Sequence, residues 1–450
     1  MKTLKEQAAI LFIMLFTGTA SGQPVTDSID YYILHRSYER AAVLCKRQLT
    51  ELPDDHGLLM NYGIAMQALQ EYDIALKSYT AALDQDNTGY AAAYRMAECY
   101  EALGDKEKAI KIYGDILEAD SCDLYSMQQK ARLLLSLKNY EQARDYYTTL
   151  LKHSPGNYLF NKNIGICQYR LLNESKAAFH FIQAWGANKR DLSLPVNIAN
   201  AYNKLKLPVN ALFYLREGLE YDSLNIPILK TAGSINYAMS NYDYAAEYLN
   251  KAYQQGDTSL FTSKYLGLSF FKLSRFEESI PHLRAFYLFD TLNTEATYYL
   301  GLALSSWHMK DEGIAWLQKT IDLSYPNPAF IASIYAAMAT AAADRNERSK
   351  AIEYYAKAIE LDSNKPRYYL ETGKLYDAKA GIDNSADLYR RAIEYYDLYL
   401  KAEQPRIEII MSQRGLREDQ ISTPGMDYAK RRIKKIREEL FFQGELEKRL

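Results

Sequence analysis

The chain has 450 residues, of which 48% are hydrophobic and 24% are charged, as in an ordinary globular protein. Its 54 lysines and arginines nearly balance its 56 aspartates and glutamates, and the formal net charge is −2. This balance argues against a general affinity for nucleic acid, which needs a strongly basic surface.

The first 22 residues predict a signal peptide. Lys2 and Lys5 give a positive start, residues 8–16 form an apolar run, and residues 18–22 are small, as at a cleavage site. An uncleaved membrane anchor is the alternative, but nine apolar residues are too few, because a spanning helix needs about 20. We expect segment 1–22 to be removed during export.

Residues 56–89 predict two short amphipathic helices joined by a turn at residues 70–72. This unit recurs along the chain at one constant spacing, with a small residue at one position of each helix. In the first helix the series is Gly63, Ala97, Ala131, Gly165, Ala199, Gly233, Gly267 and Gly301. In the second helix it is Ala41, Ala75, Ala109, Ala143, Ala177, Ala211, Ala245, Ser279 and Gly313.

Close packing explains the small residues. Two antiparallel helices approach closely where one side chain is small, and a large side chain of the facing helix fills the space. A large residue, or cysteine in the first unit, does follow each second-helix small residue by four positions: Cys45, Tyr79, Tyr113, Tyr147, Phe181, Leu215, Leu249, Leu283 and Leu317.

A strict period of 34 with small residues in both helices resembles the tetratricopeptide repeat (TPR). The resemblance covers about eleven units, nine of them contiguous over residues 23–327 and two more over residues 328–402. It implies an all-α fold, a right-handed superhelical solenoid of helical hairpins with a C-terminal capping helix. Two departures are Ile29, where a small residue belongs, and the scarcity of the family's proline near the end of each unit.

The one break in the rhythm comes at residues 325–328, Tyr-Pro-Asn-Pro, before the tenth unit. Residues 329–343 are then apolar throughout. Because they are too few to span a bilayer and fall in the register of a first helix, they predict a buried core helix.

Residues 403–450 predict an irregular connector followed by an amphipathic helix over residues 426–440, with Asp427 as a possible cap. Its apolar stripe includes Ile433 and Ile436, and its other face is basic. Such a helix could dock on a membrane or a partner. We favour a solvating cap over the last repeat.

No motif for catalysis, metal binding or nucleotide binding occurs in the sequence. Cys99 and Cys167 occupy one register position two repeats apart, too far for a disulfide, and are expected to be packing residues. Of the six histidines, His180 and His282 share one register position of the repeat, and the other four are isolated from thiol or carboxylate clusters. We therefore expect no enzyme activity, no cofactor and no metal site.

In the family, the first helices line a concave surface that binds peptides or proteins. The residues in the exposed register of units four to eight include seven cations and no Asp or Glu, with aromatic residues between them. The predicted partner-binding residues are Arg132, Lys162, Tyr169, Arg170, Lys204, Lys230, Tyr237, Lys264, Phe271 and Lys272. Because these lysines are expected to face solvent, replacing Lys204, Lys230 and Lys264 by glutamate should hardly change the melting temperature.

The resemblance also allows one test. Chaperone-binding members clamp a terminal carboxylate with Lys and Asn residues, but here Ile166, Pro227 and Thr231 stand at three of those places. A C-terminal chaperone tail is therefore not the expected ligand.

Three function classes remain. The first is a non-catalytic scaffold of the bacterial cell envelope, periplasmic or associated with the outer membrane, that binds a protein with an acidic segment. It could belong to an outer-membrane or secretion complex. The second is a peripheral membrane or polyanion binder, and the third is a glycan-binding accessory protein that uses some of the 40 tyrosines. We expect the first, with no transmembrane span.

Overall fold

The computed structural model describes residues 23–85, 89–324, 327–415, 417 and 420–447. Within these ranges the chain consists of helices and short turns, and no strand occurs there, so the all-α prediction is confirmed. The predicted signal peptide and residues 325–326 of the predicted break lie outside the described residues.

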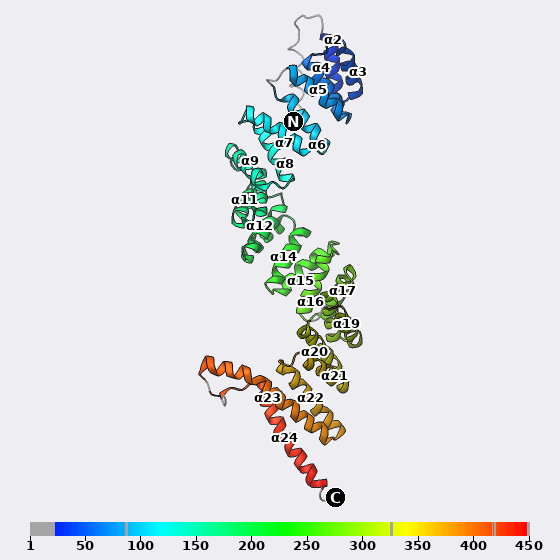
Figure 1. Cartoon of the computed structure of the whole chain (residues 1–450), viewed down its shortest axis with the longest axis vertical. Coiled ribbons are helices and arrows are strands. Elements are labelled where there is room, and N and C mark those ends of the chain that lie inside the picture. The colour runs from blue at the N-terminus through cyan, green and yellow to red at the C-terminus, as the bar shows by residue number, and fades with distance from the viewer. Residues whose placement is uncertain (1–22, 86–88, 325–326, 416, 418–419, 448–450) are drawn as a thin grey trace. The chain divides into compact units, whose positions relative to one another are not determined.

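The chain divides into two compact units, Met1–Ala211 and Leu212–Leu450. The division falls within α13 (Pro208–Tyr221), and each unit is a stack of helices (Figure 1). The helices of the first unit are α2 (Gln23–Leu34), α3 (Tyr38–Gln48), α4 (His56–Ala68), α5 (Tyr72–Gln85), α6 (Ala91–Ala102), α7 (Lys106–Ala119), α8 (Leu124–Ser136), α9 (Tyr140–His153), α10 (Tyr158–Arg170), α11 (Glu174–Ala187) and α12 (Ser193–Lys204).

The helices of the second unit continue the alternation of first and second helices. They are α14 (Ile226–Ala238), α15 (Tyr242–Gln254), α16 (Leu260–Lys272), α17 (Phe276–Phe289), α18 (Thr294–Ser306), α19 (Lys310–Leu323), α20 (Pro328–Asp344), α21 (Arg348–Leu361), α22 (Pro366–Asp383), α23 (Ala386–Arg414) and α24 (Pro424–Glu447).

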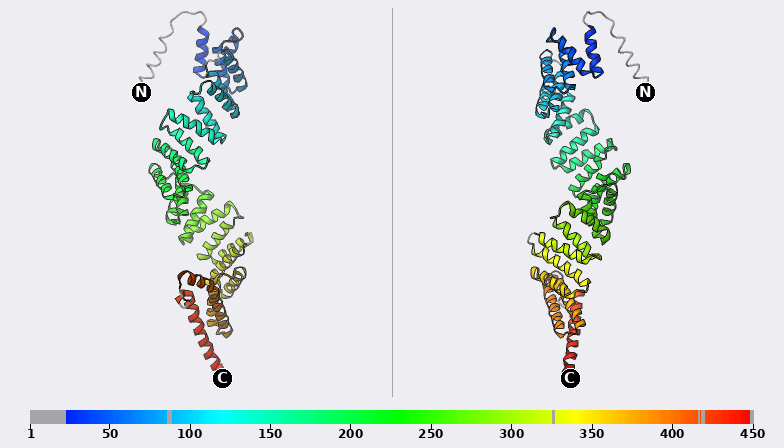
Figure 2. Two further views of the ribbon diagram at one scale, coloured as in Figure 1. Left: turned by 60° about the vertical axis from the view of Figure 1, so that its left-hand side comes forward. Right: turned by 90° about the vertical axis from the view of Figure 1, so that its right-hand side faces the viewer.

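Among the described residues, the even-numbered helices from α2 to α22 stand in the register of first helices, one for each of the eleven predicted repeats. Within each unit, consecutive helices pack against each other (Figure 2). Successive first helices also make contacts, as α2 with α4 and α4 with α6 in the first unit, and α14 with α16, α16 with α18 and α18 with α20 in the second. Because one hairpin cannot bury both of its faces, each core is completed by a neighbour.

The small residues of the first helices lie where the structure has no room for a larger one. A Cβ atom added to Gly63 would lie 2.4 Å from the Tyr79 ring, and one added to Gly165 would lie 2.6 Å from the Phe181 ring. Both contacts join a small residue of a first helix to the predicted large residue of the second helix. The packing explanation of the repeat is therefore confirmed.

A further register column, which the sequence analysis did not identify, lies in the turn between the two helices of a hairpin. Its residues have left-handed backbone conformations with φ between 57° and 84°. They recur with the period of the repeat as Arg36, Gln70, Gly104, Lys138, Leu172, Lys206, Ser240 and Ser274. One of these eight is glycine, although glycine is the residue that adopts this conformation without strain.

Polar residues cap many of the first helices. Asp55, Asp123, Asn157, Asn225 and Asn293 each accept a hydrogen bond from a backbone N–H of the following first turn. These residues belong to one register column at the end of each repeat. They satisfy backbone donors that a helix start leaves without partners.

The alanine-rich stretch after the break forms α20, which begins at Pro328 and is capped by the Asn327 side chain. Ala332, Ile334 and Met338 are buried, as expected of a core helix. In the described part of the chain, no helix is both long and apolar enough to cross a membrane.

The C-terminal segment differs in detail from the prediction. The expected connector is helical as far as Arg414, because α23 continues through Pro405. Ile407 is 3% exposed within the C-terminal core, and this burial holds the segment in helical form despite the proline. Likewise, α24 starts at Pro424, where the Thr423 hydroxyl, and not Asp427, accepts a hydrogen bond from the Met426 N–H at 3.2 Å.

The capping role of α24 is confirmed. Ala429, Ile433 and Ile436 are buried in one apolar cluster with Tyr396 and Tyr399 of α23. Residues of α22 also pack against this cluster. The apolar stripe of α24 therefore covers the last hairpin, while Lys430, Lys434 and Arg437 are exposed.

Candidate partner-binding surface

The predicted partner-binding residues all lie on first helices, from α8 to α16. Arg132, Lys162, Tyr169, Arg170 and Lys204 belong to the first unit. The second unit holds Lys230, Tyr237, Lys264, Phe271 and Lys272.

Lys162, at the fifth position of its repeat, is bound to the start of the next repeat. Its Nζ lies 2.6 Å from Asp191 Oδ2 and 3.0 Å from Ser193 Oγ. Burial raises the pKa of Asp191, but the hydrogen bonds from Lys162 and Ser193 outweigh it and hold the pKa below its usual value. The lysine therefore links two successive hairpins.

The fifth-position lysines of the second unit make the same kind of link. Lys230 Nζ lies 2.9 Å from Asp257 Oδ2 and 3.0 Å from Ser259 Oγ, and Lys264 Nζ lies 2.5 Å from Glu295 Oε2. Burial raises the pKa of Asp257, but the hydrogen bonds from Thr262, Lys230 and Ser259 outweigh it, so the pKa is lowered.

These ion pairs correct one expectation. Lys230 and Lys264 were expected to face solvent, yet their side chains are only 26% and 27% exposed. Reversing their charge would place a carboxylate beside another carboxylate. The melting temperature should therefore fall on this change, contrary to the prediction from register alone.

Arg132 and Lys204 also have acidic neighbours. Arg132 Nη2 lies 2.5 Å from Glu101 Oε2 of the preceding repeat. Lys204 Nζ lies 4.3 Å from the centre of the Tyr169 ring and 3.8 Å from Glu174 Oε1, and its side chain is 42% exposed. The Lys204 pair is long and open to water, so it contributes little stability.

The two predicted aromatic residues of the second unit pack against the next repeat. The Tyr237 ring centre lies 5.2 Å from that of Tyr265, and the Phe271 ring centre lies 5.3 Å from that of Tyr299. Burial, aided by the nearby Tyr299, raises the pKa of Tyr237 to about 12. Both side chains are partly buried and thus contribute to repeat stacking.

Arg170 and Lys272 remain as exposed cations that make no ion pair within the described residues. Lys272 lies 5.9 Å from the Tyr299 ring centre. Together with Lys204, these two residues occupy the thirteenth position of a repeat, at the last turn of a first helix. The set therefore separates by register into linking lysines and more open cations.

The acidic partners of the linking lysines were not predicted, because they lie outside the exposed register positions of the first helices. Asp191 and Asp257 precede a first helix, and Glu295 lies in the first turn of one. The sequence does contain one sign of these pairs. In all three, the acidic residue follows its lysine by slightly less than the length of one repeat.

The second unit also has a hollow that the sequence analysis did not predict. It has a volume of about 370 Å³ and lies against three successive first helices, α18, α20 and α22. Ser306, Ser333 and Thr340 supply hydroxyl groups, and Arg367 supplies a cation. Arg367 makes no ion pair within the described part of the chain.

The described residues hold no group of three or more His, Cys, Asp or Glu side chains placed to bind a metal ion. All four cysteines are free thiols in this structure, with Cys45, Cys99 and Cys167 buried and Cys122 exposed. Burial raises the pKa of the Cys99 and Cys167 thiols to about 11, which makes them poor nucleophiles.

Family models described as tetratricopeptide repeat match residues 68–126, 129–189 and 332–365. DnaJ homolog subfamily C member 3 of Gallus gallus is 34% identical over 98 residues, which are 22% of this chain and 19% of that protein. A TPR repeat-containing protein of Methanocaldococcus jannaschii is 21% identical over 321 residues, covering 67% of this chain and 55% of that protein. The chain thus spans about a fifth and about half of these two relatives.

Among solved structures, YrrB, described as a TPR protein with an unusual peptide-binding site, is 25% identical. The match covers 41% of this chain and 94% of that chain, with a TM-score of 0.38. A tetratricopeptide repeat protein from Parabacteroides merdae is 19% identical, and the match covers 54% of this chain and 97% of that chain, with a TM-score of 0.38.

The family models fall on hairpins whose small residues and turns keep the register of the repeat. Repeats of this kind indicate a scaffold for protein–protein interaction. On this combination of sequence period, hairpin packing and family matches, the chain contains tetratricopeptide repeats and folds as an all-α solenoid of such hairpins.

Proposed function

We propose that this protein is a non-catalytic scaffold of the bacterial cell envelope that binds a protein or peptide segment along its first helices. The partner would carry exposed acidic residues, and the complex would belong to the outer membrane or to a secretion system. The observation that carries the proposal is the open cation column at the last turns of α10 and α12, Arg170 and Lys204, within the first unit. Lys272 is an open cation at the same register position of α16, within the second unit.

The electrostatics support an acidic partner at this column and not at the linking lysines. Lys162, Lys230 and Lys264 already have carboxylates within 2.9 Å, so a partner would have to displace them. Arg170 and Lys272 are exposed and make no such pair among the described residues, so a partner carboxylate needs to displace only water.

Aromatic residues next to these cations support a protein ligand. Tyr169 and Phe271 directly precede Arg170 and Lys272, and both rings are partly exposed. Flat apolar rings beside a cation are typical of the residues that dominate the binding energy of protein interfaces.

The proposed location rests on the signal-peptide pattern of residues 1–22. Expression of the full chain in a bacterium should yield a mature protein that begins near residue 21 or 23. N-terminal sequencing and cell fractionation check this. A cytoplasmic chain that retains Met1 would contradict the envelope proposal without affecting the proposed binding surface.

Charge reversal tests the binding surface. The mature chain and its R170E/K204E variant would be used to capture proteins from the native envelope fraction. The K111E/K176E variant is the matched control, since it makes the same charge change at exposed positions of the second helices α7 and α11.

We expect the wild type and the control to retain the same partner and R170E/K204E to lose it. The loss should be at least about ten-fold, because complementary charge is removed at the interface. Equal retention by all three proteins, at low as well as physiological salt, would contradict binding at this surface.

A further inference from the structure

The outer side of α24 forms a second surface, separate from the first helices. One face of this helix is buried in the C-terminal core, as Ile436 is fully buried there. Lys430, Lys434, Arg437 and Phe441 follow each other at spacings of four, three and four residues, so they share another side of the helix. Because each residue adds about 1.5 Å, this row is about 16 Å long.

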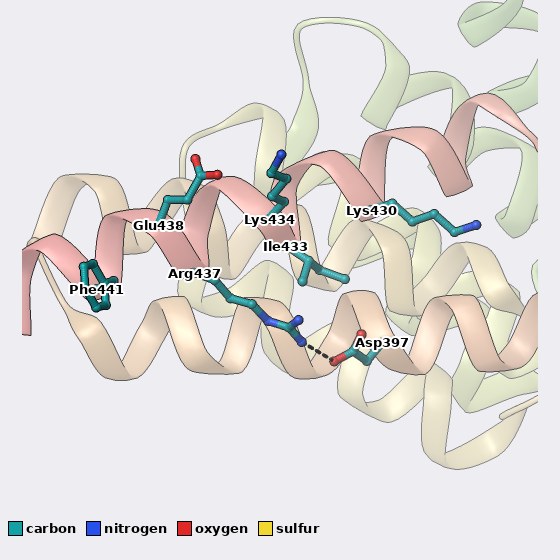
Figure 3. A pocket seen from close by; sticks show the side chains of 7 residues that line it. All are labelled: Asp397, Lys430, Ile433, Lys434, Arg437, Glu438 and Phe441. Atoms are coloured by element: carbon teal, nitrogen blue, oxygen red, sulfur yellow. Dashed lines mark ion pairs between the residues drawn. The ribbon is translucent and has the colours of Figure 1, made fainter.

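This row borders a hollow of about 580 Å³ beside α23 and α24 (Figure 3). Phe441 supplies most of its exposed apolar atoms, while Ile433, at its floor, is only 6% exposed. Phe441 is 64% exposed, which is a large apolar area for a single surface side chain. The hollow therefore combines an apolar lining with a basic edge.

The cations along the hollow are poorly neutralised. Lys430 and Lys434 make no ion pair within the described residues. Arg437 Nη2 lies 4.0 Å from Asp397 Oδ2, and both side chains are more than half exposed, so this pair is weak (Figure 3). The linking lysines of the repeats differ in this respect, since their carboxylate partners lie within 2.9 Å.

We propose that the hollow beside α23 and α24 is the docking site for an acidic amphipathic helix of a partner protein. An apolar stripe on that helix would cover the exposed Phe441 ring, as in a helix laid in a groove. Carboxylates flanking this stripe would meet Lys430 and Lys434. This inference goes beyond the proposed function, because it uses α24 and not the first helices.

The pattern of charge favours a protein helix over an anionic membrane. Asp397 and Glu438 lie among the three cations of the lining, and Figure 3 shows Glu438 pointing to the same side of α24 as Lys434. A uniformly anionic lipid surface would be repelled by these two carboxylates, and a flat surface cannot fill a hollow. A partner helix can place its acidic residues opposite the lysines only, and it can follow the groove.

Binding of a synthetic peptide to the full mature chain tests this inference. The peptide is helical, with leucines seven residues apart flanked by glutamates, and its control has lysines in place of the glutamates. Fluorescence anisotropy measures both peptides, and sedimentation with phosphatidylglycerol vesicles measures the membrane alternative. The K430E/K434E variant removes the cations, and K77E/K152E makes the same charge change at exposed positions of α5 and α9.

We expect saturable binding of the acidic peptide alone, weakened at least about ten-fold in K430E/K434E and unchanged in K77E/K152E. The F441S variant should also weaken binding, because it removes the apolar contact. Circular dichroism should be the same for all variants, since these side chains are outside the core. No saturable binding of the acidic peptide, equal binding by K430E/K434E, or vesicle binding that needs Lys430 and Lys434 would each overturn the proposal.

Discussion

The guanidinium of Arg432 on α24 holds both carboxylate oxygens of Asp377 on α22. Nη2 lies 2.6 Å from Oδ1, and Nε lies 2.7 Å from Oδ2. The Tyr396 hydroxyl donates to the same Oδ2 at 3.2 Å, and the Asp377 side chain is only 9% exposed. This bidentate ion pair fixes the position of the capping helix on the last hairpin. Apolar contacts alone would define that position less well, because they are not directional.

Replacing Arg432 by alanine should therefore detach the cap. Asp377 would keep its charge in a buried site without its cation, and breaking a buried pair in this way costs about 3–5 kcal/mol. Hydrogen exchange of the α24 amides should become fast, and urea denaturation should show an earlier loss of C-terminal helix.

Two further variants check the cause. R431A is the control, because Arg431 is exposed and its Nε donates a hydrogen bond to the carbonyl oxygen of Asp427 on the same helix. In R432A/D377N, removal of the stranded charge should restore part of the lost stability. If the α24 amides exchanged as slowly in R432A as in R431A, the Arg432–Asp377 pair would have no role in holding the cap.

The packing residues could be predicted from the sequence because the same contact between two helices recurs in each of the eleven repeats. Gly165 and Phe181, for example, keep a separation that recurs between the same two positions in repeat after repeat, so chance agreement is excluded. The link between Lys162 and Asp191 was not predictable in the same way. The position of a residue in the repeat predicts the face of the helix on which its side chain lies. It does not predict which residues of the next repeat a long side chain will contact.

The C-terminal segment shows a second limit of sequence reasoning. Pro405 suggests the end of a helix, yet α23 continues beyond it to Arg414. The deciding contacts are those of Ile407 with the cap cluster, which come from a helix later in the chain. Local propensity is a weak guide where tertiary packing of this kind decides.

Two glycines of one hairpin should respond in opposite ways to alanine. In G165A the new Cβ would lie 2.6 Å from the Phe181 ring, so overpacking should cost about 1–3 kcal/mol. In G186A the new Cβ meets nothing within 4 Å on α11, so the better helix propensity of alanine should add about 0.5–1 kcal/mol. Urea denaturation of the two variants measures both effects. An equal loss in both would mean that Phe181 does not determine the small residue at position 165.

The left-handed column in the turns offers a second matched pair. Leu172 has φ of 60°, and its side chain is 70% exposed, so L172G should relieve strain at little loss of packing. We expect a gain of about 1 kcal/mol, since left-handed backbone costs an L-residue about 1–2 kcal/mol. Gly104 has φ of 84°, and G104A should lose a similar amount because the alanine would be strained there. Thermal melting measures the change in stability of each variant, which should be positive for L172G and negative for G104A. A destabilised L172G would contradict the strain argument.

The lysine that links hairpins five and six should give a pH-dependent contribution to stability. The pKa of Asp191 is lower in the folded chain than its usual value, which is about 3.9 in an unfolded chain. The stability contributed by the pair is therefore fully present above that value and is lost as pH falls through the lower, folded pKa.

The K162M variant isolates this contribution, because methionine keeps the apolar stem and removes the charge. At pH 7 it should be less stable than the wild type by about 1–2 kcal/mol, the range for a hydrogen bond between charged groups that is partly open to water. The difference should begin to shrink as the pH is lowered below about 4, because Asp191 of the unfolded chain then becomes protonated while Asp191 of the folded wild type keeps its charge. K152M is the control, since Lys152 is exposed on α9 and makes no ion pair within the described residues. Urea denaturation between pH 3 and pH 7 measures the differences, and a K162M deficit that stays constant down to pH 3 would show that the Lys162–Asp191 ion pair is not its source.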